Sequence, residues 1–217
     1  SANPNLSGNE GELSQNISEA WIYVNDQCLG VFELPVKIPV LKSGPVNVKV
    51  YPGIKNNGVS ATKKIYPFLK VYETNITLVP NQNISLSPST QYVENTNFII
   101  EDFEGANINL VNDPNTSIAN YLLDNIDLQP FNGNAYARVQ LNQNDSLWVA
   151  YTTFSSYLPK GKEVYLELDY YTTNHVVTGL LAISPSGIKR NINYQLNRST
   201  HFLQHHLVNQ HYRHRAE

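Results

Sequence analysis

The sequence predicts an all-β protein made of two β-sandwich-like modules, the second jelly-roll-like and with a missing or degraded closing strand. Three observations support this class. Short apolar stretches alternate with turn signals about every eight to twelve residues from Glu19 onward. The first module sustains no apolar period of about 3.6 residues, which a helix would need. The 14 Tyr and 28 Asn residues suit half-buried strands and the turns between them.

The first module is expected to span residues 18–88 and to open with a hairpin. Its two strands, Ala20–Val24 and Cys28–Phe32, are separated by Asn25 and Asp26, a pair that favours a tight turn. We expect Cys28 to be a small buried hydrophobe in this hairpin. The further strands expected here are Val36–Leu41, Val46–Tyr51, Lys63–Val71, Thr74–Val79 and Ile84–Leu86.

A linker at residues 89–97 is expected to lead into the second module, residues 98–197. One helical turn is expected in Ile118–Leu128. The strands expected in this module are Phe98–Phe103, Ala135–Leu141, Leu147–Thr152, Glu163–Tyr171, Val176–Ser184 and Ile188–Leu196. A jelly roll needs about eight strands. Residues 198–217 form an atypical His-rich tail in which strand alternation is lost, so we expect the closing strand to be missing or degraded there.

Composition indicates an exported protein without catalytic machinery. Charged residues make up 15% of the chain, well below the usual share of about a quarter. The net charge of −3 is too small to indicate a nucleic-acid partner. No G-x-S-x-G nucleophile motif is present, and the single Cys28 lies in a strand. We therefore expect neither an enzyme nor an internal disulfide.

The start of the chain indicates a tether. Residues 1–17 are expected to form a flexible leader, because the first fourteen are polar and rich in Gly and Asn. Such a leader is typical of the segment after the lipidated Cys of a bacterial lipoprotein, and we expect that Cys upstream. No run of 18 apolar residues occurs, so a lipid anchor is the only membrane attachment expected.

Three segments carry a resemblance to a known family: AWIYVNDQCLGVFELPVKIPVL, PGIKNNGVSATKKIYPF and FIIEDFEG. They resemble a family of Bacteroidetes surface lipoproteins of unassigned activity. The first segment is also similar to small surface β modules of the PEGA type. The second module, through FIIEDFEG and LPKGKEVYLELDY, is similar to jelly-roll, carbohydrate-binding-like domains. The resemblance implies a location at the cell surface or in the periplasm, with lipid anchoring to the outer membrane. It brings no catalytic residues.

The first candidate site is the loop after residue 52. Lys55, Asn56 and Asn57 lie in this Gly- and Asn-rich segment, and loops on a rigid sandwich often carry binding residues. The alternative is that Gly53 and Gly58 only supply turn positions.

The second candidate site is a group of acids, Glu101, Asp102 and Glu104, at the start of the second module. Their oxygens could hold a structural calcium ion, which takes about six to eight oxygen ligands. Jelly-roll binding modules often contain one, so the resemblance adds to this interpretation. Strand alternation, however, places Glu101 and Asp102 on opposite faces. No other cofactor is expected.

The third candidate site is aromatic. Trp148, Tyr151, Tyr157 and Tyr170 could form a platform on the second sandwich, because apolar sugar faces pack flat on rings. The alternative is that these rings belong to the core, and Trp148, between Leu147 and Val149, favours it. We expect a non-catalytic, surface-anchored binding or adhesion module whose first ligand class is a polysaccharide. The alternative function is a structural or assembly component of the cell envelope that binds other proteins.

Overall fold

The computed structural model describes residues 10–11, 15–56, 61–131, 133–158, 161–196, 198 and 203–208. These residues form antiparallel β-strands and no α-helix, so the predicted all-β, sandwich-like class is confirmed. The strands are β1 (Glu19–Val24), β2 (Gln27–Glu33), β3 (Gly44–Lys55), β4 (Lys63–Ile65), β5 (Tyr72–Leu78), β6 (Leu110–Asn112), β7 (Tyr121–Asp124), β8 (Tyr136–Val139), β9 (Ala150–Thr152), β10 (Tyr165–Tyr170), β11 (Val176–Ser184), β12 (Gly187–Leu196) and β13 (Leu203–Val208). No helix in the described part of the chain has the length and hydropathy needed to cross a membrane.

The chain forms two compact units. Unit 1 takes the described residues of 15–96 and 160–217, and unit 2 takes those of 7–14 and 97–159. After Gln15 the chain stays in unit 1 up to Thr96 and enters unit 2 at Asn97. The division into modules expected from the sequence, with its linker at 89–97, stays a prediction.

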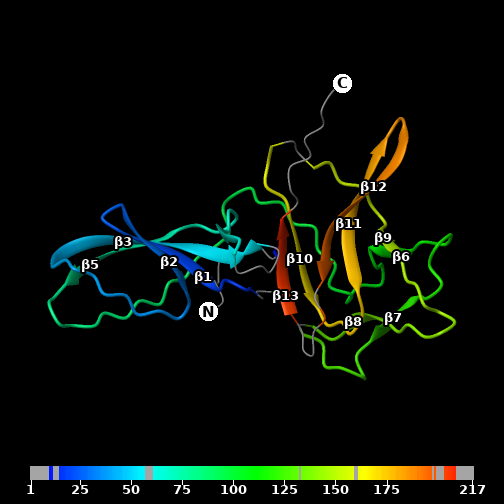
Figure 1. Ribbon diagram of the computed structural model, residues 1–217, viewed down its shortest axis with the longest axis horizontal. Helices are drawn as coiled ribbons and strands as arrows, with labels where there is room; N and C mark the ends of the chain where they lie inside the picture. The colour runs from blue at the N-terminus through cyan, green and yellow to red at the C-terminus, as the bar shows by residue number, and fades with distance from the viewer. Residues whose placement is uncertain are drawn as a thin grey trace. The chain divides into compact units, whose positions relative to one another are not determined.

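A five-stranded sheet organises the first part of unit 1 (Figure 1). Its strand order is β2-β1-β3-β4, and β5 also pairs with β3. Two strands share one edge of β3 because β3 is twelve residues long. Strand β5 pairs with the half from Gly44 to Val50, and β4 with Gly53 to Lys55.

The predicted hairpin is confirmed as β1 and β2. Asn25 and Asp26 connect the two strands, with φ values of 49° and 61°. Two successive left-handed residues match the twist of antiparallel strands, and Asn and Asp tolerate this conformation well. Asn25 also donates its backbone N–H to the carbonyl of Asn47, at 2.8 Å, which ties the turn to β3.

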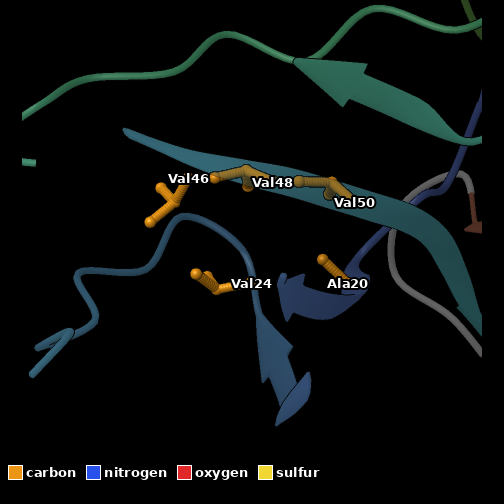
Figure 2. Close-up of a cluster of buried hydrophobic side chains, with 5 residues drawn as sticks. All are labelled: Ala20, Val24, Val46, Val48 and Val50. Carbon is orange, nitrogen blue, oxygen red and sulfur yellow. The ribbon is translucent and has the colours of Figure 1, made fainter. Parts of the chain in front are cut away.

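The core lies on one face of this sheet. Figure 2 shows Val46, Val48 and Val50 along β3, near Ala20 and Val24 of β1, and all five are buried. Even-numbered residues of β1 and β3 share this face because side chains alternate along a strand. The partly buried side chains packed against the cluster are Ile22, Leu29, Val40, Tyr72, Ile76, Leu78 and Leu86.

Two loops cover this core where strands were expected. The structure describes no strand over Val36–Leu41 or Ile84–Leu86, so these two predictions were wrong. Val40 and Leu86 nevertheless pack on the core. Apolar side chains can reach the core from a loop, and Pro39 would in any case remove a ladder donor from a strand.

A β-bulge explains another wrong expectation. The β1–β2 register shifts between Ile22, which pairs with Gly30, and Tyr23, which pairs with Cys28. Cys28 therefore shares the face of Tyr23, away from the core, and it is exposed rather than buried. Leu29 takes the inward position instead.

Residues after 160 join this sheet through an aromatic cluster within unit 1. The rings of Tyr66, Phe68 and Tyr165 meet edge to face, with centroids 5.4 to 5.5 Å apart. Tyr165 opens β10, whereas Tyr66 and Phe68 follow β4. Such ring pairs contribute about 0.5–1.5 kcal/mol beyond the area that they bury.

Two polar contacts accompany the cluster. Lys64 Nζ lies 2.7 Å from both carboxylate oxygens of Glu163. The hydroxyl of Tyr66 donates a hydrogen bond to Glu167. Burial, reinforced by the negative charge of Glu167, raises the pKa of Tyr66 far above its ordinary value. Both effects favour the protonated hydroxyl, which is the form that donates to Glu167.

The remaining strands of unit 1 form two ribbons. Strand β13, from the predicted tail, pairs with β10 over the six residues from Leu203 to Val208. Strands β11 and β12 form a long hairpin closed at Ser184 and Gly187. The rest of the predicted tail, apart from Arg198, lies outside the described residues.

Unit 2 contains two short ribbons, β6 with β9 and β7 with β8. The helical turn expected in Ile118–Leu128 is wrong, because strand β7 occupies Tyr121–Asp124. Phe98–Phe103 forms no strand either. In that segment Glu101 accepts backbone hydrogen bonds from a loop, and Phe103 has a φ of 61°, which is incompatible with an extended strand.

Candidate functional site

The outer face of the five-stranded sheet carries an aromatic cluster. Trp21 and Tyr23 alternate along β1 with the apolar side chains of Ala20, Ile22 and Val24, which face the core. Alternation therefore directs the two rings to the opposite side of the sheet. Both residues are partly exposed.

Strand β3 adds a third ring. Tyr51 lies directly opposite Trp21, and Lys49 lies opposite Tyr23. The rings of Tyr23 and Tyr51 meet edge to face, with centroids 5.4 Å apart and planes at 69°. Edge-to-face contact is one of the geometries that aromatic pairs favour. We call Trp21, Tyr23 and Tyr51 the aromatic face.

Gly53 allows Trp21 to lie close to the backbone of β3. A Cβ atom at position 53 would come within 2.4 Å of Cζ3 in the Trp21 ring. The ring thus occupies space that any other residue at position 53 would fill. Here the Gly serves close approach rather than a turn.

Polar side chains line the same face beside the rings. Lys49 Nζ lies 2.7 Å from Asp26 and 3.9 Å from Glu73. The side-chain amide of Asn47 donates to Glu73 at 2.9 Å and to Asn75 at 3.0 Å. The hydrogen bond to Asp26 is the largest of the effects that raise the pKa of Lys49. We call these five residues the polar row.

Tyr23 adds a hydroxyl group to this face. A hydrogen bond to the side chain of Cys28 is the main cause that raises the pKa of Tyr23 above its ordinary value. The aromatic face and the polar row together offer ring surfaces beside amide, carboxylate, ammonium and hydroxyl groups. Such a mixture can orient a flat ligand that is apolar on its faces and polar at its edges.

The predicted platform residues Trp148 and Tyr151 lie in unit 2 and are engaged in its internal hydrogen bonds. Trp148 donates its ring N–H to Oδ1 of Asn112, at 2.6 Å. The hydroxyl of Tyr151 donates to Oδ2 of Asp113, at 2.6 Å, and Asp113 is buried. Both rings are partly buried, and their polar atoms hold β9 and the segment before it against β6.

The other two predicted platform residues lie elsewhere. Tyr157 follows β9 in unit 2 and is 87% exposed. Tyr170 ends β10 in unit 1 and is partly buried. The four predicted rings are thus divided between the two units, and neither unit contains them all.

The predicted loop residues are placed near the end of β3. Lys55 Nζ lies 3.1 Å from Glu33 and 3.8 Å from Glu19. The backbone N–H of Asn56 donates to the carbonyl of Thr62, at 2.9 Å, which closes the loop. Asn57 lies outside the described residues.

A buried carboxylate accompanies Lys55. Glu19 is fully buried at the end of β1, and Lys63 Nζ lies 2.7 Å from its Oε2. A buried charge is tolerated only with such a partner. Lys55 and Lys63 therefore serve an ion-pair network at the sheet end.

The predicted calcium ligands accept hydrogen bonds from the chain itself. Glu101 and Asp102 each bond the backbone N–H two residues further along, at 2.8 and 3.0 Å. Glu104 bonds the Asn134 side chain at 3.0 Å and the Ala135 backbone at 2.8 Å. Bonds to Asn134 are the main cause that lowers the pKa of Glu104. Among the described residues, no three His, Cys, Asp or Glu side chains are grouped as metal ligands would be.

Unit 2 also has a hollow of about 210 Å³. Ligand pockets are usually larger, at about 300–1,000 Å³. The hollow connects to Trp148 through Asn112, whose side chain donates to Asn120 at 2.7 Å. Its lining residues are Ile118, Ala119, Asn120, Leu122, Arg138, Gln140 and Asp145.

Comparison with protein-family models, with curated proteins and with solved structures finds no match to this chain. The resemblance to Bacteroidetes lipoproteins, and the location that it implies, therefore stay predictions.

Sequence reasoning missed the three residues of the aromatic face. The signal was present in the hairpin segment AWIYV, where aromatic and aliphatic residues alternate. One face of this strand is aliphatic and the other is aromatic. In a sheet with a single core, only one of these two faces can be directed to the core. That Tyr51 joins Trp21 and Tyr23 could not be read from this segment, because it depends on the pairing of β1 with β3.

Proposed function

We propose that this protein is a non-catalytic binding module that recognises a polysaccharide through the aromatic face of its five-stranded sheet. The observation that carries this proposal is the position of Trp21, Tyr23 and Tyr51 on one side of the sheet, beside the polar row. Ring surfaces pack on the apolar faces of sugars, and neighbouring amide and carboxylate groups bond their hydroxyls.

The sheet suits this role because its opposite face is anchored in the core. Tyr51 lies on β3 with the core valines, and Trp21 and Tyr23 lie on β1 with the core residues Ala20 and Val24. Rigid strands position binding groups more accurately than loops do. We further propose that the protein is located at the cell surface or in the periplasm, where polysaccharides are present.

A glycan array probed with the full chain tests the proposal first, and isothermal titration with a captured oligosaccharide then measures affinity. Tyr51→Thr removes one ring while keeping a good strand former. We expect its affinity to fall at least about tenfold, which corresponds to about 1.4 kcal/mol.

The matched control is Tyr157→Thr, the same change at an exposed ring of unit 2. It should bind as tightly as the unaltered chain, and both variants should keep the unaltered circular dichroism spectrum. Binding to no polysaccharide, or equal loss in both variants, would overturn the proposal.

The alternative function, an envelope component that binds other proteins, is supported by a different feature. The β11–β12 hairpin exposes a row of apolar side chains. Exposed apolar surface of this kind marks protein interfaces in many soluble proteins.

A further inference from the structure

The lysines on the outer face of the five-stranded sheet are paired and largely covered. Among the described residues this face carries Lys49, Lys55 and Lys63, whose side chains are 25%, 30% and 33% exposed. Lys49 Nζ lies 2.7 Å from Asp26, and Lys63 Nζ lies 2.7 Å from the buried carboxylate of Glu19. The ammonium groups are thus engaged within the sheet, and they leave little positive charge for a ligand.

The carboxylates on the same face are more open. The side chains of Asp26, Glu33 and Glu73 are 81%, 67% and 49% exposed, whereas Glu19 is buried. Four carboxylates beside three ammonium groups give the described part of this face a net charge of −1. Because the ammonium groups are covered, the exposed charge is negative. A ligand that approaches the face therefore meets carboxylates first.

Two of these carboxylates lie beside the rings. Lys49 of β3 pairs with Tyr23 on one side and with Glu73 of β5 on the other, so the three side chains form one row across the sheet. Asp26 joins this row through its contact with Lys49. Side chains directly opposite each other have Cβ atoms about 4.5–5.5 Å apart. The carboxylates thus lie at a distance from a sugar on Tyr23 that is comparable to the Debye length, about 10 Å at about 0.1 M salt.

We propose that the aromatic face selects polysaccharides without negative charge, and that Asp26 and Glu73 are the residues that exclude uronate and sulfate sugars. This inference rests on the proposed function and adds the class of polysaccharide to it. A carboxylate or sulfate on the sugar would face exposed carboxylates, and such like-charge contacts are unfavourable. Neutral hydroxyl groups can instead donate hydrogen bonds to the same carboxylates, and hydrogen bonds to a charged acceptor are strong ones.

A double variant, Asp26→Asn with Glu73→Gln, removes both charges and keeps the shape of the face. Asn tolerates the left-handed backbone at position 26, where φ is 61°. Gln at position 73 keeps an oxygen that accepts the hydrogen bond from Asn47. Lys49 would then have no charged partner in this row, so a sugar carboxylate should be attracted to it.

The matched control is Glu94→Gln. Glu94 is 86% exposed and is paired with Lys70 at 3.3 Å, so its charge is also that of an open, lysine-paired carboxylate. It lies after β5 and outside the strands of the sheet. The same change of charge at this position should therefore leave the selectivity of the aromatic face unaltered.

A glycan array tests the inference by pairing neutral hexose oligosaccharides with the same oligosaccharides after oxidation of their primary hydroxyls to carboxylates. At a low salt concentration of about 20 mM, we expect the unaltered chain and Glu94→Gln to bind the neutral forms at least about tenfold more tightly. The double variant should bind both forms within about threefold of each other. In the unaltered chain the preference should shrink at about 500 mM salt, because salt screens exposed charges.

The outcomes separate this inference from the proposed function. Equal or tighter binding of the oxidised forms by the unaltered chain would overturn the inference. If that binding is lost in Tyr51→Thr, polysaccharide binding by the aromatic face still stands. A double variant that keeps the full preference for neutral forms would also overturn the inference, because other groups would then set the selectivity. Binding of no oligosaccharide by either the unaltered chain or the double variant would overturn the proposed function and this inference together.

Discussion

The five-stranded sheet and the β11–β12 hairpin are built from the same alternation of side chains but differ in what covers them. In the sheet, Val46, Val48 and Val50 are buried because side chains of the neighbouring strand β1 and of two loops pack against them. In the hairpin, Ile183, Ile188 and Ile192 remain exposed. An alternating apolar pattern thus predicts a face that must be covered, and the covering layer has to come from elsewhere.

The same comparison applies to the two faces of the sheet. The inner face is aliphatic and covered, whereas the outer face combines three aromatic rings with a polar row. Aliphatic side chains gain most from full burial. Rings with polar tips are suited to a face that is apolar yet partly wet. The outer face therefore tolerates partial exposure, which the inner face does not.

The largest expected effect separates the covered face from the open one. Val48→Asp places a charge in the core and should lower the free energy of unfolding by more than about 4 kcal/mol. Ile192→Asp makes the same chemical change on the hairpin and should alter it by less than about 0.5 kcal/mol. Chemical denaturation of the unaltered chain and the two variants checks both. Equal losses would contradict the difference in burial.

A smaller effect tests the packing of Trp21. Gly53→Ala puts a methyl group where the Trp21 ring lies and should cost about 1–3 kcal/mol of stability. Gly105→Ala is the control, because a Cβ atom there would meet its nearest neighbours at 3.7 Å. Thermal melts should show a lower Tm only for Gly53→Ala. The same variant should bind the polysaccharide more weakly, because its Trp21 ring must move.

The next effect tests the junction of β10 with the sheet. Tyr66→Phe removes the hydroxyl that bonds Glu167 and should cost about 1–2 kcal/mol. Tyr157→Phe should be neutral because Tyr157 is exposed. Urea unfolding of both variants checks the difference. An unchanged midpoint for Tyr66→Phe would show that residues after 160 are not held to the sheet by this contact.

The smallest effect depends on pH. Hydrogen bonds to Glu104 lower its pKa in the folded state, so they stabilise the folded chain fully above the unfolded pKa. That contribution is lost as the pH falls through the folded pKa. NMR titration of the carboxyl carbon should place the Glu104 midpoint below the ordinary Glu value, and Asn134→Ala should raise it. An unshifted midpoint in the unaltered chain would contradict these hydrogen bonds.

Local signals explain what could be predicted from the sequence. The hairpin and its turn at Asn25 and Asp26 were predicted because turn chemistry acts over a few residues. Two expected strands proved to be loops, because an apolar run such as Val36–Leu41 is equally compatible with a loop that packs on the core. The exposure of Cys28 depends on a β-bulge that no residue type in the segment indicates.

The candidate sites were harder to predict for a related reason. The Trp148 hydrogen bond spans 36 residues and the Tyr151 bond spans 38, and neither partner is marked by a motif. Glu101, Asp102 and Glu104 look like metal ligands in sequence because loop capping uses the same carboxylates. The aromatic face requires the register of β1 on β3, which only the folded sheet supplies.

The two tryptophans allow the most direct test of polysaccharide binding by the aromatic face. The chain contains only Trp21 and Trp148, so its NMR spectrum should show two indole N–H signals, assigned by replacing each Trp with Phe. Titration with the oligosaccharide captured on the array should shift the Trp21 signal and leave the Trp148 signal in place. A shift of Trp148 alone would place the binding site in unit 2 and contradict the account.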